Sequence, residues 1–319
     1  MTTALISVVA AVALSAATVE SDPPAEAAIA AALDGLHSAA TRADGPAYAD
    51  RLDPDLVWIG ADVGERWAHD AYVAFADTQF EDGEGWTHSA RARRVWLAPD
   101  PCECLAWADE VLDSDTYGAA VGNAVMRRGQ DGEWRVWRYA LTYPIPNDLA
   151  RGMTDEIKAW EAANPAPPQQ PVPVTVETLP IHETLDAFHT AAANADGPAY
   201  FALFTPDAAY RGTDVTELWP LAEFRAFAEP YFAQGRGWTY TPAWRRVSIA
   251  ETPCACVAWF DEMLESESYG TSRGTGVMVR GDDGVWRIAY YALTFPIPNA
   301  LASEMMARIR AAAAVESPQ

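Results

Sequence analysis

Apolar positions along the first half of the chain follow a helical period at first and a strand period later. Residues 26–43 are rich in alanine and repeat their larger apolar side chains at helical spacing. The segment Asp44-Gly-Pro predicts the end of that helix. A short strand at Leu56–Ile59 and a second helix at Ala68–Phe80 follow.

Four longer runs then predict strands, because they are rich in aromatic and branched residues and lie between turn residues. Asp131-Gly132 is typical of a hairpin turn between the last two. Helices followed by a series of antiparallel strands indicate an α+β fold. The four runs are Thr87–Ala98, Cys104–Asp113, Tyr117–Arg128 and Trp134–Tyr143.

This pattern occurs twice. Leu33–Leu149 aligns with Leu185–Leu301 without a gap, and about half of the aligned positions are identical. A repeat of this length has the size of a domain. The sequence therefore predicts domains at 26–160 and 179–315, joined by an extended proline-rich linker at 161–178.

Several repeated motifs also carry a family resemblance. In their order they resemble the SnoaL-like branch of the nuclear transport factor 2-like superfamily, and the resemblance covers both units. They are Gly60-Ala-Asp-Val-Gly-Glu-Arg-Trp67, its copy Gly212-Thr-Asp-Val-Thr-Glu-Leu-Trp219, the strand Trp259-Phe-Asp-Glu262 and its copy Trp107-Ala-Asp-Glu110, the segment Arg273-Gly-Thr-Gly276, and the Pro-Ile-Pro-Asn segments that close each unit.

The resemblance implies two cone-shaped α+β barrel domains in tandem, each a curved antiparallel sheet covered by N-terminal helices around a pocket. Domains of this superfamily commonly pair through their sheets, so the two repeats are expected to form a pseudo-dimer. The superfamily includes isomerases, dehydratases, hydrolases, ligand binders and association domains. The resemblance therefore implies a fold without fixing an activity.

Charge excludes two classes of partner. Asp and Glu number 45 against 22 Lys and Arg, which gives a formal net charge of −23. Such a surface repels nucleic-acid phosphates and anionic lipid headgroups, so neither nucleic acid nor a membrane is an expected partner. The sequence holds no nucleophile elbow, phosphate loop or zinc-protease motif, and no cofactor or metal is expected.

The N-terminus has the character of a targeting signal. Residues 4–17 are apolar or small without a charge, which is typical of the core of a signal peptide, and small residues end the segment. We therefore predict a signal peptide at 1–17 and a periplasmic or secreted protein. Residues 1–3, which precede this segment, include no Lys or Arg. The alternative is therefore a buried apolar helix or a mis-chosen start codon.

Repeated polar residues provide the first candidates for a site. His37 and His189 are matched between the repeats, and each is either a general base at the pocket or a partly buried histidine with a structural partner. The loops after the first strands carry Asp62, Glu65 and Trp67, repeated as Asp214, Glu217 and Trp219. These carboxylates either bind a ligand or cap a turn, with the glutamates paired to Arg93 or Arg245.

The strands provide the second group. Adjacent strand residues face opposite sides, so only one carboxylate of Asp109-Glu110 or Asp261-Glu262 reaches the pocket. We expect Asp109 and Asp261, beside Trp107 and Trp259, to be those residues. Tyr139, Tyr290 and Tyr291 of the closing strands are further candidates for the ligand wall, although aromatic strand residues more often form the core.

Two Cys-x-Cys pairs precede equivalent strands. In an exported protein an even number of cysteines favours disulfides, so a bond within each pair is expected. A zinc site shared by all four is one alternative, although the usual ligand spacing is missing. Free thiols are the other, if the protein stays in the cytoplasm. The pairs are Cys102 with Cys104 and Cys254 with Cys256.

The repeats differ in ways that predict where a ligand binds. Arg273 stands where the first unit has Val121, and Ala289 stands where it has Trp137. A guanidinium near Asp214 and Asp261, next to open space, suits an acidic ligand. The sequence therefore places a small-molecule site in the second unit, with candidate catalytic residues His189, Asp214 and Asp261. An acid–base enzyme and a scaffold without a ligand are the alternative functions.

Overall fold

The computed structural model describes residues 24–81, 83–99, 102–165 and 172–316, which form two equivalent units. The first unit contains α1 (Ala25–Thr41), α2 (Gly45–Ala49), β1 (Leu52–Ile59), β2 (Arg66–Ala68), α3 (His69–Phe80), β3 (His88–Leu97), β4 (Leu105–Ser114), β5 (Gly118–Arg128), β6 (Trp134–Thr142) and α4 (Asn147–Ala163). The second contains α5 (Leu179–Ala193), α6 (Gly197–Phe201), β7 (Phe204–Arg211), β8 (Leu218–Pro220), α7 (Leu221–Phe232), β9 (Thr241–Ile249), β10 (Val257–Ser266), β11 (Gly270–Arg280), β12 (Trp286–Thr294) and α8 (Asn299–Glu316).

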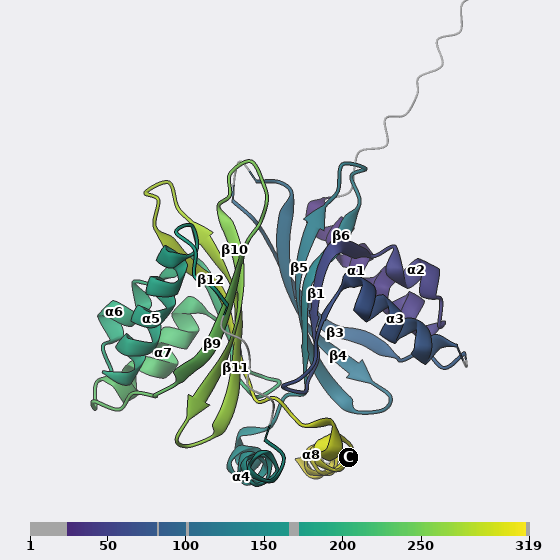
Figure 1. The fold of residues 1–319 in the computed structure, drawn as a ribbon. Helices are drawn as coiled ribbons and strands as arrows, with labels where there is room; N and C mark the ends of the chain where they lie inside the picture. Colours follow the sequence, from purple (N-terminus) through teal and green to yellow (C-terminus); the bar gives the residue numbers. More distant parts are fainter. Residues whose placement is uncertain (1–23, 82, 100–101, 166–171, 317–319) are drawn as a thin grey trace, which may run out of the picture.

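Each unit has one six-stranded sheet, in the order β2-β1-β6-β5-β4-β3 or β8-β7-β12-β11-β10-β9. The sheets are curved but not closed into barrels, and three helices cover one face of each (Figure 1). The cone-shaped α+β fold is thereby confirmed. The expectation of a wholly antiparallel sheet is wrong at one pairing, since β1 runs parallel to β6 and β7 to β12. Parallel strands need a long crossover connection, and the segment from β2 to β5 between β1 and β6 is long enough to provide it.

The two sheets pack against each other through the faces that the helices leave uncovered (Figure 1). One apolar cluster joins residues of both units, among them Trp107, Trp137, Trp259 and Tyr290. The repeats therefore form the expected pseudo-dimer within one chain. Aligned sheets packed face to face bury one another's side chains in this way.

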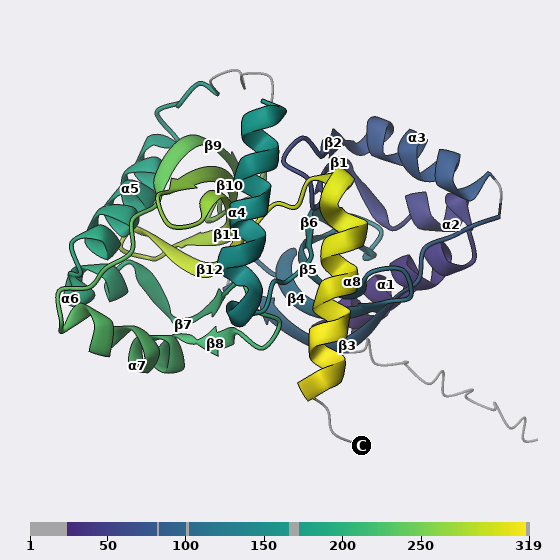
Figure 2. The same ribbon diagram turned by 90° about the horizontal axis from the view of Figure 1, so that it is seen from below.

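The sequence did not predict the helices that follow each closing strand. α4 and α8 lie side by side beneath the sheets (Figure 2) and share one apolar cluster with Ile145 and Ile297. Proline has no N–H for a ladder hydrogen bond, and its fixed φ suits a helix start, so two prolines in Pro-Ile-Pro-Asn mark the change from β6 to α4 and from β12 to α8. The signal lay in a motif that was noted only as a repeat.

Each of these helices is capped by the other unit. The backbone N–H of Asn299, at the start of α8, donates to Asp62 at 2.9 Å, and its side-chain amide donates to Glu65 at 2.8 Å. Asn147 makes the equivalent bonds to Asp214 at 3.3 Å and Glu217 at 2.8 Å. The carboxylates thus satisfy backbone donors that a helix leaves free at its first turn.

A buried ion pair also joins the units. Arg211 of β7 donates through Nε to Asp109 of β4 at 2.9 Å, and both side chains are at most 2% exposed. The Tyr290 hydroxyl and the Asn123 amide donate to the same carboxylate at 2.6 and 3.1 Å. Arg211 and Tyr290 reach Asp109 from the second unit, whereas Asn123 lies beside it on β5 of the same sheet.

No helix in the described ranges is long and apolar enough to cross a membrane. The predicted signal peptide at 1–17 lies outside the described residues.

Replacing Arg211 by Ile, the residue at the equivalent position 59, should lower the free energy of unfolding by about 3–5 kcal/mol, because Asp109 would remain buried without its counter-charge. Urea denaturation measures the change. Arg135→Ala removes an ion pair to exposed Asp131 and should cost much less. Equal losses in the two variants would contradict the importance of the buried pair.

Removing a crossed cap should have a smaller effect. Asp62→Ala takes the acceptor from the first turn of α8 and should cost about 1 kcal/mol, as for other helix N-terminal caps. Asp214→Ala should cost a similar amount through α4, since the two caps are equivalent. Thermal denaturation followed by circular dichroism provides both values, and an unchanged melting temperature in both variants would refute the capping role.

Candidate functional site

A cavity lies between the sheet and the helices of each unit. The cavity of the first unit has a volume of about 360 Å³, and that of the second about 200 Å³. Aromatic side chains are the largest group of lining residues in the first cavity, and its polar lining residues include Glu65, Gln79, His88 and Asn299. The aromatic lining residues are Trp58, Trp67, Tyr72, Phe75, Trp86, Tyr117 and Tyr143.

The repeats differ at several lining positions. Tyr240 lines the second cavity where His88 lines the first, and Thr213 stands where the first has Ala61. Other substitutions act in the opposite direction, such as Tyr210 in place of Trp58. The first cavity is the larger of the two, although Arg273 and Ala289 led us to expect a ligand site in the second unit.

The mouth of each cavity carries a stacked aromatic pair. Trp67 stacks on Phe75 with ring centroids 5.2 Å apart, and Trp219 stacks on Phe227 at 5.0 Å. Phe75 and Phe227 are 40% and 44% exposed. Trp67 and Trp219, both predicted ligand contacts, do line their cavities.

The glutamates of these loops accept hydrogen bonds from the other unit. Glu65 lines the first cavity, but its two oxygens accept from the Asp62 N–H at 3.2 Å and from Asn299 at 2.8 Å. Glu217 lines the second cavity with equivalent bonds. Arg93 and Arg245 do not pair with these glutamates. They pair with Glu110 and Glu262 of the neighbouring strands.

The predicted histidines are buried residues of the helices α1 and α5, and each belongs to a network of polar side chains. His37 Nε2 lies 3.2 Å from Glu110, to which Arg93 also donates at 2.8 Å. Burial alone would raise the pKa of Glu110, but His37 and Arg93 outweigh it and lower the pKa. The Tyr139 hydroxyl donates to Glu110 at 3.4 Å.

The second unit repeats this network with shorter bonds. Glu262 lies 2.8 Å from His189 and accepts from Arg245 at 2.7 Å and from Tyr291 at 2.9 Å. Burial opposes ionisation of Glu262, yet His189 and Arg245 lower its pKa to about 2. Both glutamates are therefore permanent anions among fixed donors, which indicates a structural role.

The strand carboxylates face the opposite way to the prediction. Glu110 and Glu262 lie on the helix-covered side, whereas Asp109 and Asp261 lie between the two sheets with Trp107 and Trp259. The expectation assigned the aromatic face to the pocket, but that face covers the other sheet. Tyr290 belongs to this interface as well, and Tyr291 to the core of its own unit.

Arg273 also lies at the interface. It donates to the carbonyl oxygens of Gly60 at 2.6 Å and Asp62 at 3.0 Å, both in the first unit. Burial lowers the pKa of Arg273 to about 10, and the attraction of Asp261 offsets this only in part. The structure therefore brings Arg273 near Asp261 but not to Asp214 or the cavity of the second unit.

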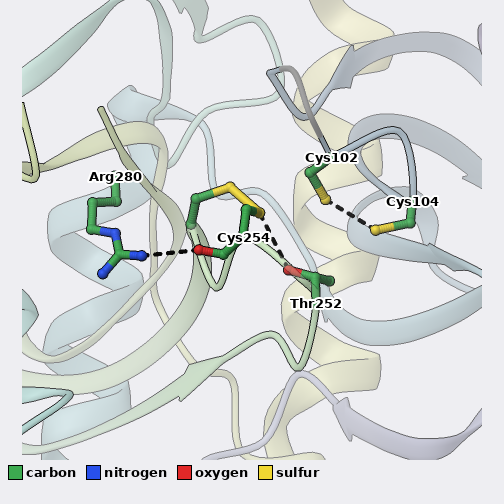
Figure 3. Close-up of a disulfide and its surroundings, with 6 residues drawn as sticks. Cys102, Cys104, Thr252, Cys254 and Arg280 are labelled. Carbon is green, nitrogen blue, oxygen red and sulfur yellow. Dashed lines mark hydrogen bonds between the residues drawn. A yellow bond between two sulfur atoms is a disulfide. The ribbon is translucent and has the colours of Figure 1, made fainter. Parts of the chain in front are cut away.

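The two cysteine pairs differ. Cys254 and Cys256 form a disulfide, whereas the sulfur atoms of Cys102 and Cys104 are 3.0 Å apart without a bond (Figure 3). All four belong to the apolar cluster between the sheets. Within the described ranges there is no group of three or more His, Cys, Asp or Glu side chains placed to hold a metal ion.

Sequence reasoning missed His88, Gln79 and Asn299 as lining residues of the first cavity. His88 could have been noticed as a change from Tyr240 between otherwise similar repeats. Asn299 was noted only as part of a repeated motif, because its contact with the other unit depends on the pairing of the sheets.

Comparison with known proteins identifies the family. The sequence model of the SnoaL-like domain matches residues 29–146 and 181–298. The chain belongs to the SnoaL-like family. It holds two tandem SnoaL-like domains, one in each unit. A search of curated proteins gives no significant match.

Similar solved structures include a nuclear transport factor 2-like protein of unknown function from Pseudomonas putida KT2440, at 18% identity and a TM-score of 0.33, covering 39% of this chain and 90% of that one. Another is a putative ketosteroid isomerase from Shewanella frigidimarina, at 15% identity and 0.31, covering 37% and 97%. A third is an uncharacterised protein with a cystatin-like fold from Caulobacter vibrioides, at 18% and 0.34, covering 42% and 98%. Similarity at this level does not identify an activity.

His88 should make the stability of the protein depend on pH. Burial, with a smaller effect of His37, lowers the pKa of His88 to about 4, against about 6.5 in an unfolded chain. Between these values the unfolded state binds more protons, so the free energy of unfolding falls as the pH falls from 6.5 towards 4. His88→Tyr should remove this contribution, up to about 1.4 kcal/mol per pH unit.

Urea denaturation of both proteins at pH 7, 6 and 5 provides the comparison. The carboxylates that titrate in this range are common to both proteins, so their contribution cancels in the difference. Parallel pH profiles would show that His88 is not buried in the neutral form.

Proposed function

We propose that the protein binds a small, flat, uncharged molecule in the cavity of its first SnoaL-like domain, and that the second domain is mainly a structural partner. The observation that carries this proposal is the open cavity of about 360 Å³ with aromatic walls in the first unit. Ligand pockets commonly have about 300–1,000 Å³ and apolar walls with few polar groups. The second cavity, at about 200 Å³, is below that range.

The polar groups of the first cavity favour a neutral ligand. Each oxygen of Glu65 already accepts a hydrogen bond from a neutral donor, and the charge that the carboxylate keeps disfavours an anionic ligand. His88 is neutral near pH 7 because its pKa is lowered to about 4. A ligand with a ring between the aromatic walls and a polar group towards His88 or Gln79 fits these surroundings.

An acid–base enzyme has less support. A general base works best with a pKa near the working pH, and the pKa of His88 is far below neutrality. His189 is engaged by Glu262, and Asp214 caps α4. Asp261 lies in the sheet interface, away from both cavities. A scaffold without a ligand would not need an open cavity of about 360 Å³ in the first unit.

The proposed location is the periplasm or the exterior of the cell. The disulfide between Cys254 and Cys256 suits an oxidising compartment, where such bonds persist. The apolar segment at 4–17 suits an export signal. Detection of the mature protein in a periplasmic extract, with its first residues removed, would test this proposal.

A thermal-shift screen of uncharged aromatic metabolites against the whole protein tests the binding function. A ligand that binds only the folded state should raise the melting temperature in proportion to the logarithm of its concentration. Trp67→Ala, which opens the wall of the first cavity, should weaken binding of the compound at least tenfold. Trp219→Ala, the matched change in the second unit, should leave binding within twofold.

The matched pair controls for general loss of packing, because both tryptophans stack on an equivalent phenylalanine. Loss of binding in Trp219→Ala with retention in Trp67→Ala would place the site in the second unit. A screen without a stabilising compound would contradict the binding function.

A further inference from the structure

A second hollow lies between the two units and is separate from both cone cavities. It has a volume of about 710 Å³ and takes lining residues from both domains. Leu97, Pro99 and Trp107 come from the first unit. The second unit contributes most of the remainder, including Thr205, Val279 and Ala289, and the disulfide between Cys254 and Cys256 (Figure 3).

The first unit has larger side chains at the equivalent positions. There Trp137 stands in place of Ala289 and is 3% exposed, with the Arg138 guanidinium 3.7 Å above its ring. Arg127 stands in place of Val279 and donates to Asp53 at 2.7 Å and to Asp55 at 2.8 Å. A tryptophan and an ion pair thus occupy the pseudo-symmetric positions.

Three substitutions open the hollow on the second unit. Ala289 replaces a tryptophan, Val279 replaces an arginine and Thr205 replaces the aspartate that paired with it. The arginine and the buried aspartate are therefore lost together, and the carboxylate that remains, Asp207, is exposed, so no buried charge is left alone. Loss of packing at one position would only destabilise the interface. The absence of all three larger groups therefore indicates that the space they would fill has a function.

Two residues that line the hollow have buried hydrogen-bonding groups without a partner within the described protein. The indole N–H of Trp107 is buried, in a residue 4% exposed, and makes no hydrogen bond. The Thr205 hydroxyl is also buried without one. A buried donor without an acceptor is costly, and a bound acceptor would remove that cost.

Charge at the rim restricts the ligand. Asp207 and Asp282 are exposed carboxylates at the opening, while Arg280 donates to the Cys254 carbonyl at 2.9 Å. The rim therefore carries more negative than positive charge, in a chain with a net charge of −23. Anions are repelled from such an opening.

We propose that this inter-domain hollow is a second binding site, for an uncharged or cationic aromatic molecule that places a carbonyl or similar acceptor against the Trp107 indole N–H. Leu97, Val279 and Ala289 provide its apolar walls. The site belongs to the paired units, since neither unit supplies all of it.

Nile red, a flat uncharged dye with a carbonyl acceptor, serves as the probe, and the anionic dye 1-anilinonaphthalene-8-sulfonate as the comparison. Nile red should bind the whole protein with a saturable rise in fluorescence. Ala289→Trp, which copies the first unit, should weaken that binding at least tenfold. Trp107→Phe keeps an aromatic side chain, although a smaller one, removes the N–H, and should weaken Nile red binding about threefold or more.

Trp67→Ala distinguishes this site from the first cone cavity. The part of the Nile red binding that is lost in Ala289→Trp should be unchanged in Trp67→Ala. Absence of Nile red binding, or binding unaffected by both Ala289→Trp and Trp107→Phe, overturns the proposal. Loss of all binding in Trp67→Ala alone also overturns it, since the dye then occupies the cone cavity. Equally tight binding of the anionic dye overturns the ligand class. If circular dichroism shows that Ala289→Trp does not fold, Trp107→Phe decides.

Discussion

Each sheet of this protein has two apolar faces, and its own helices can cover only one of them. The remaining faces must meet a surface of similar size, and the second unit supplies it. Tryptophans and branched side chains of both sheets form a single cluster as a result. Burial of this apolar area is the constraint on which the crossed helix caps, the buried ions and the inter-domain hollow all depend.

Pairing the sheets buries the carboxylates Asp109 and Asp261, each 1% exposed. The two units differ in the partners that stabilise these charges. Asp109 has Arg211, Tyr290 and Asn123 as close partners. Asp261, its counterpart, has only longer contacts to Arg66 at 3.6 Å and Arg246 at 3.8 Å. Burial consequently raises the pKa of Asp261, although these arginines counteract it.

The sequence was sufficient for the fold because the repeat and its motifs lie in regular elements. The predicted helix at 68–80 and the four strand runs agree with α3 and β3–β6 within a few residues. Side-chain alternation correctly separated the two faces of β4. It could not say which face the helices cover, because that depends on contacts distant in sequence, so Asp109 was assigned to the pocket in place of Glu110.

The candidate site was harder to predict for the same reason. Arg273 and Ala289 were recognised as differences between the repeats, but their surroundings come from the other unit. A contact between the two units produces no periodic pattern in the sequence of either unit. Asp62 and Asp214 show the same limit, since the helices that they cap begin far along the chain.

Covalent fusion gives the pseudo-two-fold axis a further consequence. In a homodimer of identical chains, each amino-acid replacement appears on both sides of the axis, so a change that enlarges one cavity enlarges the other and any loss of stability is doubled. Here each side is encoded separately. Trp137 and Ala289 can therefore differ, as can Arg211 and Ile59, and one half of the molecule is free to diverge while the other maintains the interface.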